Sequence, residues 1–146
     1  MPQTTEEAAI RSVLESLGRA ISSKDPDATL APYAPEIVRY DLAPPLAMQG
    51  PQALDRAELI AWFKTWRGPI GNEARDMHVE MSGDLALVYG LIRMAGTKTD
   101  GQDVDLWARQ TVGLRKREGA WTIIHQHTST PFYMDGSMKA AVDLKP

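Results

Sequence analysis

The second half of the sequence alternates apolar and polar residues in a way that few folds can accommodate. From Glu73 to Thr130 the apolar residues recur at every second position, which is the period of a strand with one buried face. Short turn-forming segments at 82–84, 99–102 and 117–119 interrupt this alternation. Because strands joined by such short turns pair antiparallel, the pattern predicts a meander of strands at 73–81, 85–97, 103–116 and 120–130.

The first half is predicted to be mainly helical. Thr4 and Glu7 have the spacing of a capping box, and Pro26 is expected to end the helix that they begin. Apolar residues recur along one face of this helix at helical spacing: Ile10, Val13, Leu14, Leu17 and Ile21. A helical turn at 27–30, a strand at 36–41 and a proline-rich loop should then lead to a second helix, which begins at Asp55 and ends at the segment "RGPIGN".

Helices that precede an antiparallel meander indicate an α+β fold. Long strands bend as they twist, so a bent sheet with helices over its hollow face would form a cone-shaped barrel. The chain has 146 residues and is expected to form one domain, 1–146.

Composition excludes several classes of function. The net charge of −3 gives no basis for nucleic-acid binding, and the apolar runs are too short to span a membrane. The absence of cysteine excludes disulfides and thiolate chemistry. The first ten residues do not have the pattern of a signal peptide, so we expect a cytoplasmic protein.

The last predicted strand carries two histidines among apolar residues. In a regular strand Trp121, Ile123, His125 and His127 share one face. A two-residue turn at 118–119 would place His125 opposite Val112 and His127 opposite Gln110. A three-residue turn at 117–119 would place them opposite Thr111 and Arg109, and it is favoured because Gly119 then occupies the position that needs a left-handed backbone.

With the three-residue turn, one cavity would hold a guanidinium, two imidazoles and two indoles. Arg109 stays protonated and can grip an oxyanion, whereas an imidazole beside it stays neutral and can accept a proton. We therefore expect His127 as a general base, His125 as an orienting or relay group, and Arg109 as the electrostatic partner. The other interpretation is that both histidines form ordinary hydrogen bonds across the sheet.

Asp41 is a second candidate base, because a carboxylate at a strand end beside an apolar cavity can have its pKa raised by desolvation. Its alternative role is a turn former ahead of the prolines. The predicted substrate-binding residues are Trp107, Thr111, Trp121, Ile123, Trp66 and Met48. A metal held by His125, His127 and either Asp41 or His78 is disfavoured by the positive charge of Arg109, so no metal is expected.

Four segments, "YAPEIVRYDLAPPL", "SGDLALV", "LWARQTVGLRKREGAWTIIHQHTSTPF" and "DLKP", resemble the SnoaL-like branch of the nuclear transport factor 2-like superfamily, which is related to ketosteroid isomerase. The resemblance implies a cone-shaped α+β barrel with a pocket between sheet and helices, and a homodimer packed through the sheets. Val112, Leu114 and Ile124 are the candidates for that dimer surface.

In this resemblance the isomerase's general-base aspartate falls at Asp41, its oxyanion-hole tyrosine near Leu17 and its protonated acid near Thr111. Leu17 cannot donate a hydrogen bond, so the sequence does not predict steroid isomerisation by that mechanism. The sequence therefore predicts a protein that binds a hydrophobic small molecule and moves a proton beside a carbonyl or enol, as an isomerase, cyclase or dehydratase without a cofactor. The alternative is a non-catalytic ligand-binding or dimerising module of the same fold.

Overall fold

The helices of this protein begin where the sequence places side-chain caps. In the computed structural model, which describes residues 4–146, α1 (Thr5–Ser22) starts with the Thr4 hydroxyl accepting a hydrogen bond from the Glu7 amide. The short α2 (Pro26–Leu30) follows, and a 3₁₀ helix (Gly50–Leu54) leads to α3 (Arg56–Phe63). Asp55 caps α3 by accepting from the Glu58 amide. Both predicted caps are confirmed.

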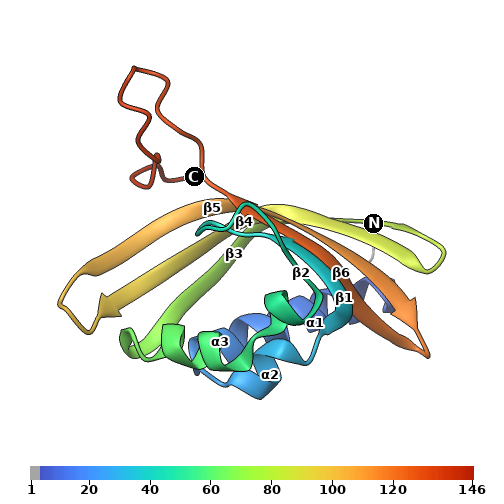
Figure 1. Ribbon diagram of the computed structural model, residues 1–146. Coiled ribbons are helices and arrows are strands. Elements are labelled where there is room, and N and C mark those ends of the chain that lie inside the picture. Colours follow the sequence, from blue (N-terminus) through green and yellow to red (C-terminus); the bar gives the residue numbers. More distant parts are fainter. Residues whose placement is uncertain (1–3) are drawn as a thin grey trace.

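Six strands form one sheet in the order β2-β1-β6-β5-β4-β3. Their bounds are β1 (Tyr33–Tyr40), β2 (Met48–Gln49), β3 (Trp66–Ser82), β4 (Leu85–Lys98), β5 (Asp103–Arg117) and β6 (Ala120–Ser129). All neighbours are antiparallel except β1 and β6. Figure 1 shows the sheet as an arch, with the helices beneath it and the C-terminal segment above. This is the predicted α+β fold, a strongly bent sheet with helices in its hollow.

One strand is longer than the sequence predicted. β3 begins at Trp66, so that the segment "RGPIGN", which was predicted to end the second helix, belongs to the sheet. Because β3 is an edge strand, the missing N–H of Pro69 removes no hydrogen bond that a second neighbour would need. Trp66 is consequently a strand residue, although the sequence predicted a helix that continues up to the segment "RGPIGN".

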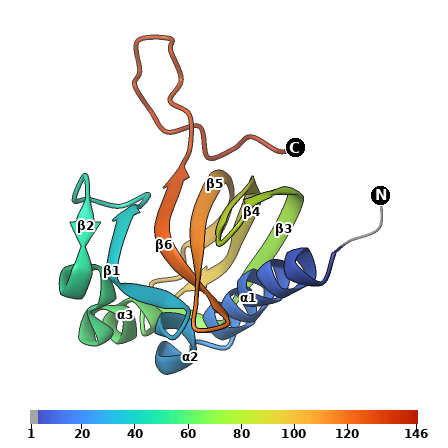
Figure 2. The ribbon, with the colours of Figure 1, turned by 90° about the vertical axis from the view of Figure 1, so that its right-hand side faces the viewer.

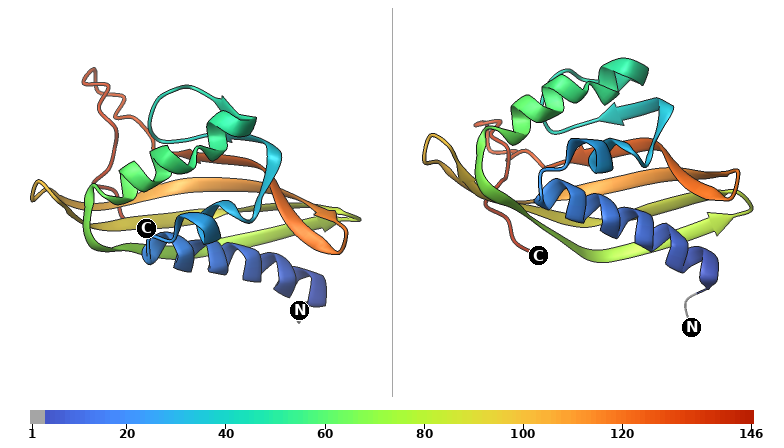
Figure 3. Two further views of the ribbon diagram at one scale, coloured as in Figure 1. Left: turned by 60° about the horizontal axis from the view of Figure 1, so that its bottom comes forward. Right: turned by 90° about the horizontal axis from the view of Figure 1, so that it is seen from below.

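α1 lies on the concave side of the sheet, whose concave face we call the inner face (Figures 2 and 3). The main core lies between this helix and the inner face. Its fully buried side chains are Ile10, Ile37, Val88, Val112, Leu114 and Ile123. Phe63, Trp66 and Ile70 form a second cluster, against which α3 packs. Among residues 4–146 no helix is both long enough and apolar enough to cross a bilayer.

The hairpin between β5 and β6 differs from the favoured prediction. Arg117 pairs with Ala120 across a two-residue turn in which both Glu118 (φ 50°) and Gly119 (φ 82°) have left-handed backbones, as the mirror-image hairpin turn requires. The pairing then slips by one residue, since Leu114 pairs with Ile123 whereas Gly113 pairs with His125. Ile124 is thus the extra residue of a β-bulge.

This bulge reverses the faces of β6. Trp121 and Ile123 point into the core before it, whereas Gln126 and Thr128 are the buried residues after it. His125 and His127 consequently lie on the convex face of the sheet, which we call the outer face, as do their partners Gly113 and Thr111. The prediction that both histidines share a face with Trp121 and Ile123 is wrong, because it assumed unbroken alternation.

Candidate functional site

A cavity of about 640 Å³ lies between α1 and the inner face of the sheet. Its apolar lining comes from α1 and from strands β3 and β4: Leu14, Leu17, Ile21, Ala74, Met77, Val88 and Ile92. The α1 residues reach the cavity because they belong to the apolar stripe that the sequence predicted for this helix. A space of this size, with an apolar wall, is within the range of cavities that hold small organic ligands.

Carboxamide side chains supply the polar part of the wall. Asn72 of β3, Gln110 of β5 and Gln126 of β6 all line the cavity. The Tyr33 hydroxyl donates a hydrogen bond to Gln126 Oε1 at 2.9 Å, and Gln110 Nε2 donates to the Thr128 hydroxyl at 3.2 Å. Burial raises the pKa of Tyr33 above its ordinary value, so this hydroxyl keeps its proton and can donate.

The charged residues of the lining lie toward solvent. Glu15, Arg19 and Asp76 are exposed, and Arg11 is half-buried and bonded to Glu7 and to the Met77 carbonyl. Asp76 has a left-handed backbone (φ 56°) at an irregularity of β3, where the pairing slips between Arg75 and His78. The cavity therefore has an uncharged interior and a charged opening.

Gly90 makes room for this irregularity of β3. A Cβ at Gly90 would collide with Met77 Sδ and would lie 2.9 Å from the Asp76 carbonyl oxygen. No side chain could therefore be placed at this position unless its neighbours moved. The glycine thus allows β3 to approach β4 where Asp76 and Met77 meet the cavity.

Asp41, one of the two predicted bases, lies away from this cavity. Its carboxylate accepts from Arg39 Nη2 at 3.0 Å and from the Leu42 amide at 2.8 Å, which is the turn-forming role considered as its alternative. Arg39 also donates to the Ala53 carbonyl and lies over the Tyr33 ring, 5.1 Å from its centroid. Asp41 therefore helps to hold Arg39 against the core.

The other predicted catalytic residues gather on the outer face. His125 Nδ1 lies 2.8 Å from the Val38 carbonyl oxygen, and the Tyr40 ring makes edge-on contacts with both imidazoles, at 4.9 Å from His125 and 5.4 Å from His127. Arg109 donates to the Ser129 hydroxyl at 3.3 Å. The three groups share one face of the sheet, but it is the face turned away from the helices and the cavity.

The predicted substrate-binding residues are also outside the cavity lining. Trp107 and Thr111 lie on the outer face with Arg109, since their partners in β4 are Arg93 and Tyr89. Ile123 and Trp121 are core residues, and Trp121 Nε1 donates to Glu6. Trp66 belongs to the second core cluster and Met48 packs against the main one. Of the ten predicted site residues, none is among those that line the cavity described within residues 4–146.

The residues that do line the cavity carried a signal that the sequence interpretation missed. In β5 the even positions Ala108, Val112 and Leu114 are apolar and buried, whereas the odd positions include Arg109 and Arg115. The preference of charged side chains for solvent therefore assigns the even positions, with Gln110, to the inner face. In β6 the bulge hides the corresponding signal.

Val112 and Leu114 are core residues, so their proposed place on a dimer surface is wrong.

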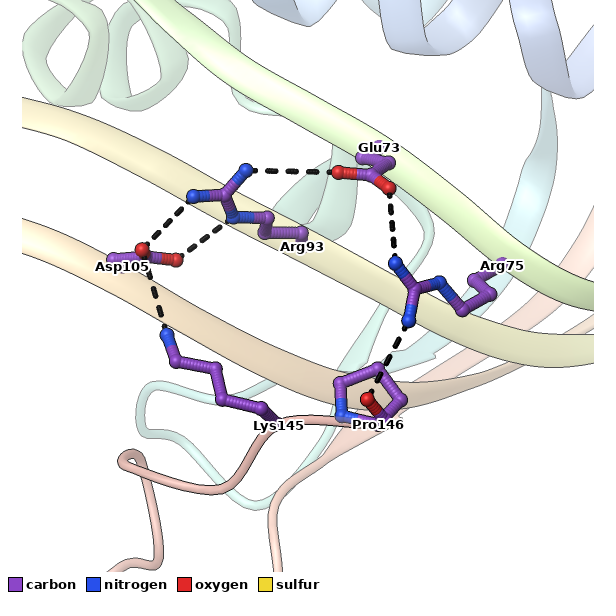
Figure 4. A network of polar contacts seen from close by, with 6 residues as sticks. All are labelled: Glu73, Arg75, Arg93, Asp105, Lys145 and Pro146. Carbon is purple, nitrogen blue, oxygen red and sulfur yellow. Dashed lines mark hydrogen bonds and ion pairs between the residues drawn. The ribbon is translucent and has the colours of Figure 1, made fainter.

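A network of charged residues covers another part of the outer face (Figure 4). Arg93 donates two hydrogen bonds to Asp105, at 2.8 and 2.9 Å, and also approaches Glu73. Lys145 reaches Asp105 from the C-terminal segment at 3.4 Å. The hydrogen bond from Arg93, with the charge of Lys145 in addition, lowers the pKa of Asp105 from its ordinary 3.8 to about 2.

The part of the chain that the structure describes contains no group of side chains suited to bind a metal ion. Across residues 4–146, no three side chains of His, Cys, Asp or Glu are grouped so that they could hold a metal ion. Within these residues, neither Asp41 nor His78 lies where it could complete a three-ligand metal site with His125 and His127.

Comparison with known proteins identifies the family. The model of the SnoaL-like domain matches residues 10–133. The chain belongs to the SnoaL-like family. A crystal structure of an NTF2-like protein of unknown function from Pseudomonas putida is 34% identical, with a TM-score of 0.85, and the match covers 99% of this chain and 100% of that one. The predicted family is confirmed.

More distant structures share the fold alone. A putative scytalone dehydratase from Novosphingobium aromaticivorans is 16% identical, with a TM-score of 0.77, over 87% of this chain and 85% of that one. The association domain of C. elegans CaMKII is 18% identical, with a TM-score of 0.68, over 88% of this chain and 98% of that one. No curated protein matches the chain. This chain is thus a pocket protein of the SnoaL-like family, in a fold that also hosts a putative dehydratase and an association domain.

Within this SnoaL-like domain, the positions carried over from ketosteroid isomerase fall in three different places. Leu17 lines the cavity. Thr111 is on the outer face, paired with His127, and it is Gln110 that faces the cavity. Asp41 is bonded to Arg39 outside the cavity. The constellation of that isomerase is therefore not assembled in this cavity.

Proposed function

We propose that this protein binds a hydrophobic small molecule in the cavity between α1 and the sheet. The observation that carries the proposal is the composition of the cavity wall, which joins seven apolar side chains to three carboxamides. Apolar walls supply most of the binding free energy for a small ligand, while a few placed polar groups orient it. The membership in a family of pocket proteins supports the same function.

The test is a binding titration with a neutral naphthyl ketone whose fluorescence shifts to the blue in an apolar site. We expect saturable binding by the native protein. Leu17→Trp fills the cavity from α1 and should abolish the shift, whereas His127→Gln alters only the outer face and should leave the dissociation constant unchanged. Equal loss in both variants, or none in either, would contradict binding in this cavity.

A proton-transfer enzyme of the isomerase, cyclase or dehydratase type is the second candidate. It is favoured by the carboxylates of Glu15 and Asp76, which both line the cavity and could act as a base on a bound ligand without a cofactor. Turnover should be sought with enolisable aromatic ketones and lactones. If turnover occurs, Asp76→Asn or Glu15→Gln should lower kcat. If turnover is retained in both of these variants but lost in Asp41→Asn or His127→Gln, the base is one of the two residues that the sequence predicted.

We also propose that the protein forms a homodimer that packs through the outer face of the sheet. Tyr40, His127, Thr111, Tyr89 and His78 are successive partners in one row across five strands. Beside this row Leu85 and Leu87 are exposed by 43% and 44%. Such a broad, partly apolar sheet face is typical of an association surface.

The dimer can be tested by light scattering after size-exclusion chromatography. We expect Leu87→Glu to shift the protein toward a monomer, because it buries a charge in the apolar part of that face. Ser12→Glu, on the exposed side of α1, is the matched control and should leave the mass unchanged. A native protein that is monomeric at all concentrations would contradict this part of the proposal.

A further inference from the structure

Two cavity-lining glutamines each have one hydrogen-bonding atom in use and one free. Gln126 Oε1 accepts from Tyr33, and its Nε2 has no partner among residues 4–146. Gln110 Nε2 donates to Thr128, and its Oε1 has no partner in the same part of the chain. Neither free atom is among the fully buried unpartnered atoms, so both are accessible to solvent, and both residues line the cavity. The wall therefore offers one free donor and one free acceptor.

The free atoms belong to neighbouring positions of the inner face. Gln110 pairs with Thr128 and Val112 pairs with Gln126, which makes the two glutamines diagonal neighbours on adjacent strands. Long side chains at such positions can reach a common partner. The contacts with Tyr33 and Thr128 hold the two amides in a defined orientation, so their free atoms are placed before any ligand binds.

The same part of the wall provides no unpaired charge. The buried and half-buried side chains of the lining are aliphatic, thioether, carboxamide or hydroxyl, apart from Arg11, whose charge is paired with Glu7; Glu15, Arg19 and Asp76 are exposed. An ionised ligand group placed against the glutamines would lose its hydration without gaining an ion pair, which is costly.

We infer that the two glutamines recognise an uncharged carbonyl group that carries a hydrogen-bond donor beside it, as in a carboxamide or a lactam. Gln126 Nε2 would donate to the carbonyl oxygen and Gln110 Oε1 would accept from the adjacent N–H. This inference rests on the proposed ligand-binding function and names the ligand class for that cavity.

The test uses four naphthalene derivatives of similar size, namely the 2-carboxamide, the 2-methyl ketone, the 2-carboxylate and the unsubstituted hydrocarbon, each displacing the fluorescent ketone at neutral pH. One net hydrogen bond corresponds to about a fivefold change in affinity, so the carboxamide should bind about fivefold more tightly than the methyl ketone. The carboxylate should bind most weakly of the four.

Two variants separate the contributions of the glutamines. Gln110→Met removes only the acceptor, so the affinity of the carboxamide should fall to that of the methyl ketone while the affinity of the methyl ketone is unchanged. Gln126→Met removes the donor and should bring both close to the hydrocarbon. Because Gln126→Met also leaves the Tyr33 hydroxyl without its partner, near-ultraviolet circular dichroism should confirm that it is folded; the result for Gln110→Met decides the inference if it is not.

The outcomes distinguish this inference from the function on which it rests. Equal affinities across the four compounds, or tightest binding of the carboxylate, would overturn the inference and leave ligand binding in the cavity intact. Absence of binding by all four, together with no fluorescence shift, would overturn the proposed function and the inference with it.

Discussion

The two faces of the sheet have opposite characters, although the same strands form both. The inner face carries aliphatic side chains and carboxamides around a cavity, whereas the outer face carries all three histidines together with Arg109 and the arginine-carboxylate network of Figure 4. The residue types most often associated with acid-base chemistry are thus on the side that has no helix over it. A cluster of titratable residues in the sequence does not identify a cavity until the face that it occupies is known.

Placing a carboxylate on the inner face should have the largest effect. Val112 is fully buried there, so Val112→Asp would put a charge into an apolar core, and we expect this variant not to fold, as measured by circular dichroism and thermal unfolding. Thr111→Asp, one residue away on the outer face, is the matched control and should fold. Equal effects of the two substitutions would contradict the assignment of the two faces.

Truncating a side chain should cost far more on the inner face than on the outer. Leu114 is fully buried, so Leu114→Ala should lower the free energy of unfolding by about 2–5 kcal/mol. Leu85, on the outer face, is 43% exposed, and Leu85→Ala should change the free energy of unfolding of the monomer by less than about 0.5 kcal/mol. Urea denaturation of both variants measures the difference. Similar values for the two would remove the energetic distinction between the faces.

Glycines offer a second matched pair, of intermediate effect. A Cβ at Gly90 would collide with Met77 and the β3 backbone, so Gly90→Ala should destabilise the protein by about 1–3 kcal/mol. A Cβ at Gly113, on the outer face, would meet its nearest atom at 3.7 Å, which is an ordinary contact. Gly113→Ala should therefore be neutral or slightly stabilising in the same urea experiment, by less than about 1 kcal/mol. A neutral Gly90→Ala would indicate that β3 can move away from β4 without cost.

The smallest expected effect concerns pH and the outer-face network. Because Arg93 lowers the pKa of Asp105 to about 2, the ionised carboxylate stabilises the folded state above its ordinary pKa of 3.8, and this contribution is lost as the pH falls toward 2. We expect Asp105→Asn to reduce the loss of stability between about pH 4 and pH 2, as followed by thermal unfolding across that range. Unfolding profiles that are parallel in the native and variant proteins would contradict a contribution from Asp105.

The helices and the meander could be predicted from the sequence because their signals are local. Thr4 and Asp55 mark helix starts by their side-chain chemistry, and the alternation after Glu73 marks the strands. The candidate site could not be predicted in the same way. The parity of β6 changes at Ile124, and no residue of that strand marks the change, because the glycine at the bulge, Gly113, belongs to the partner strand β5. The prediction that the odd positions of β5 face the cavity is wrong for the same reason, because it depends on their pairing with the two histidines.

What the sequence determined by itself is the set of elements and their order, since caps, turns and periodicity act over a few residues. The tertiary structure decided which side chains meet inside the sheet, because that choice depends on the pairing of strands distant in sequence and on a one-residue slip between them. A period of two makes such a slip decisive: every side chain beyond it changes face, and the cavity of this protein is lined by glutamines where the sequence suggested histidines.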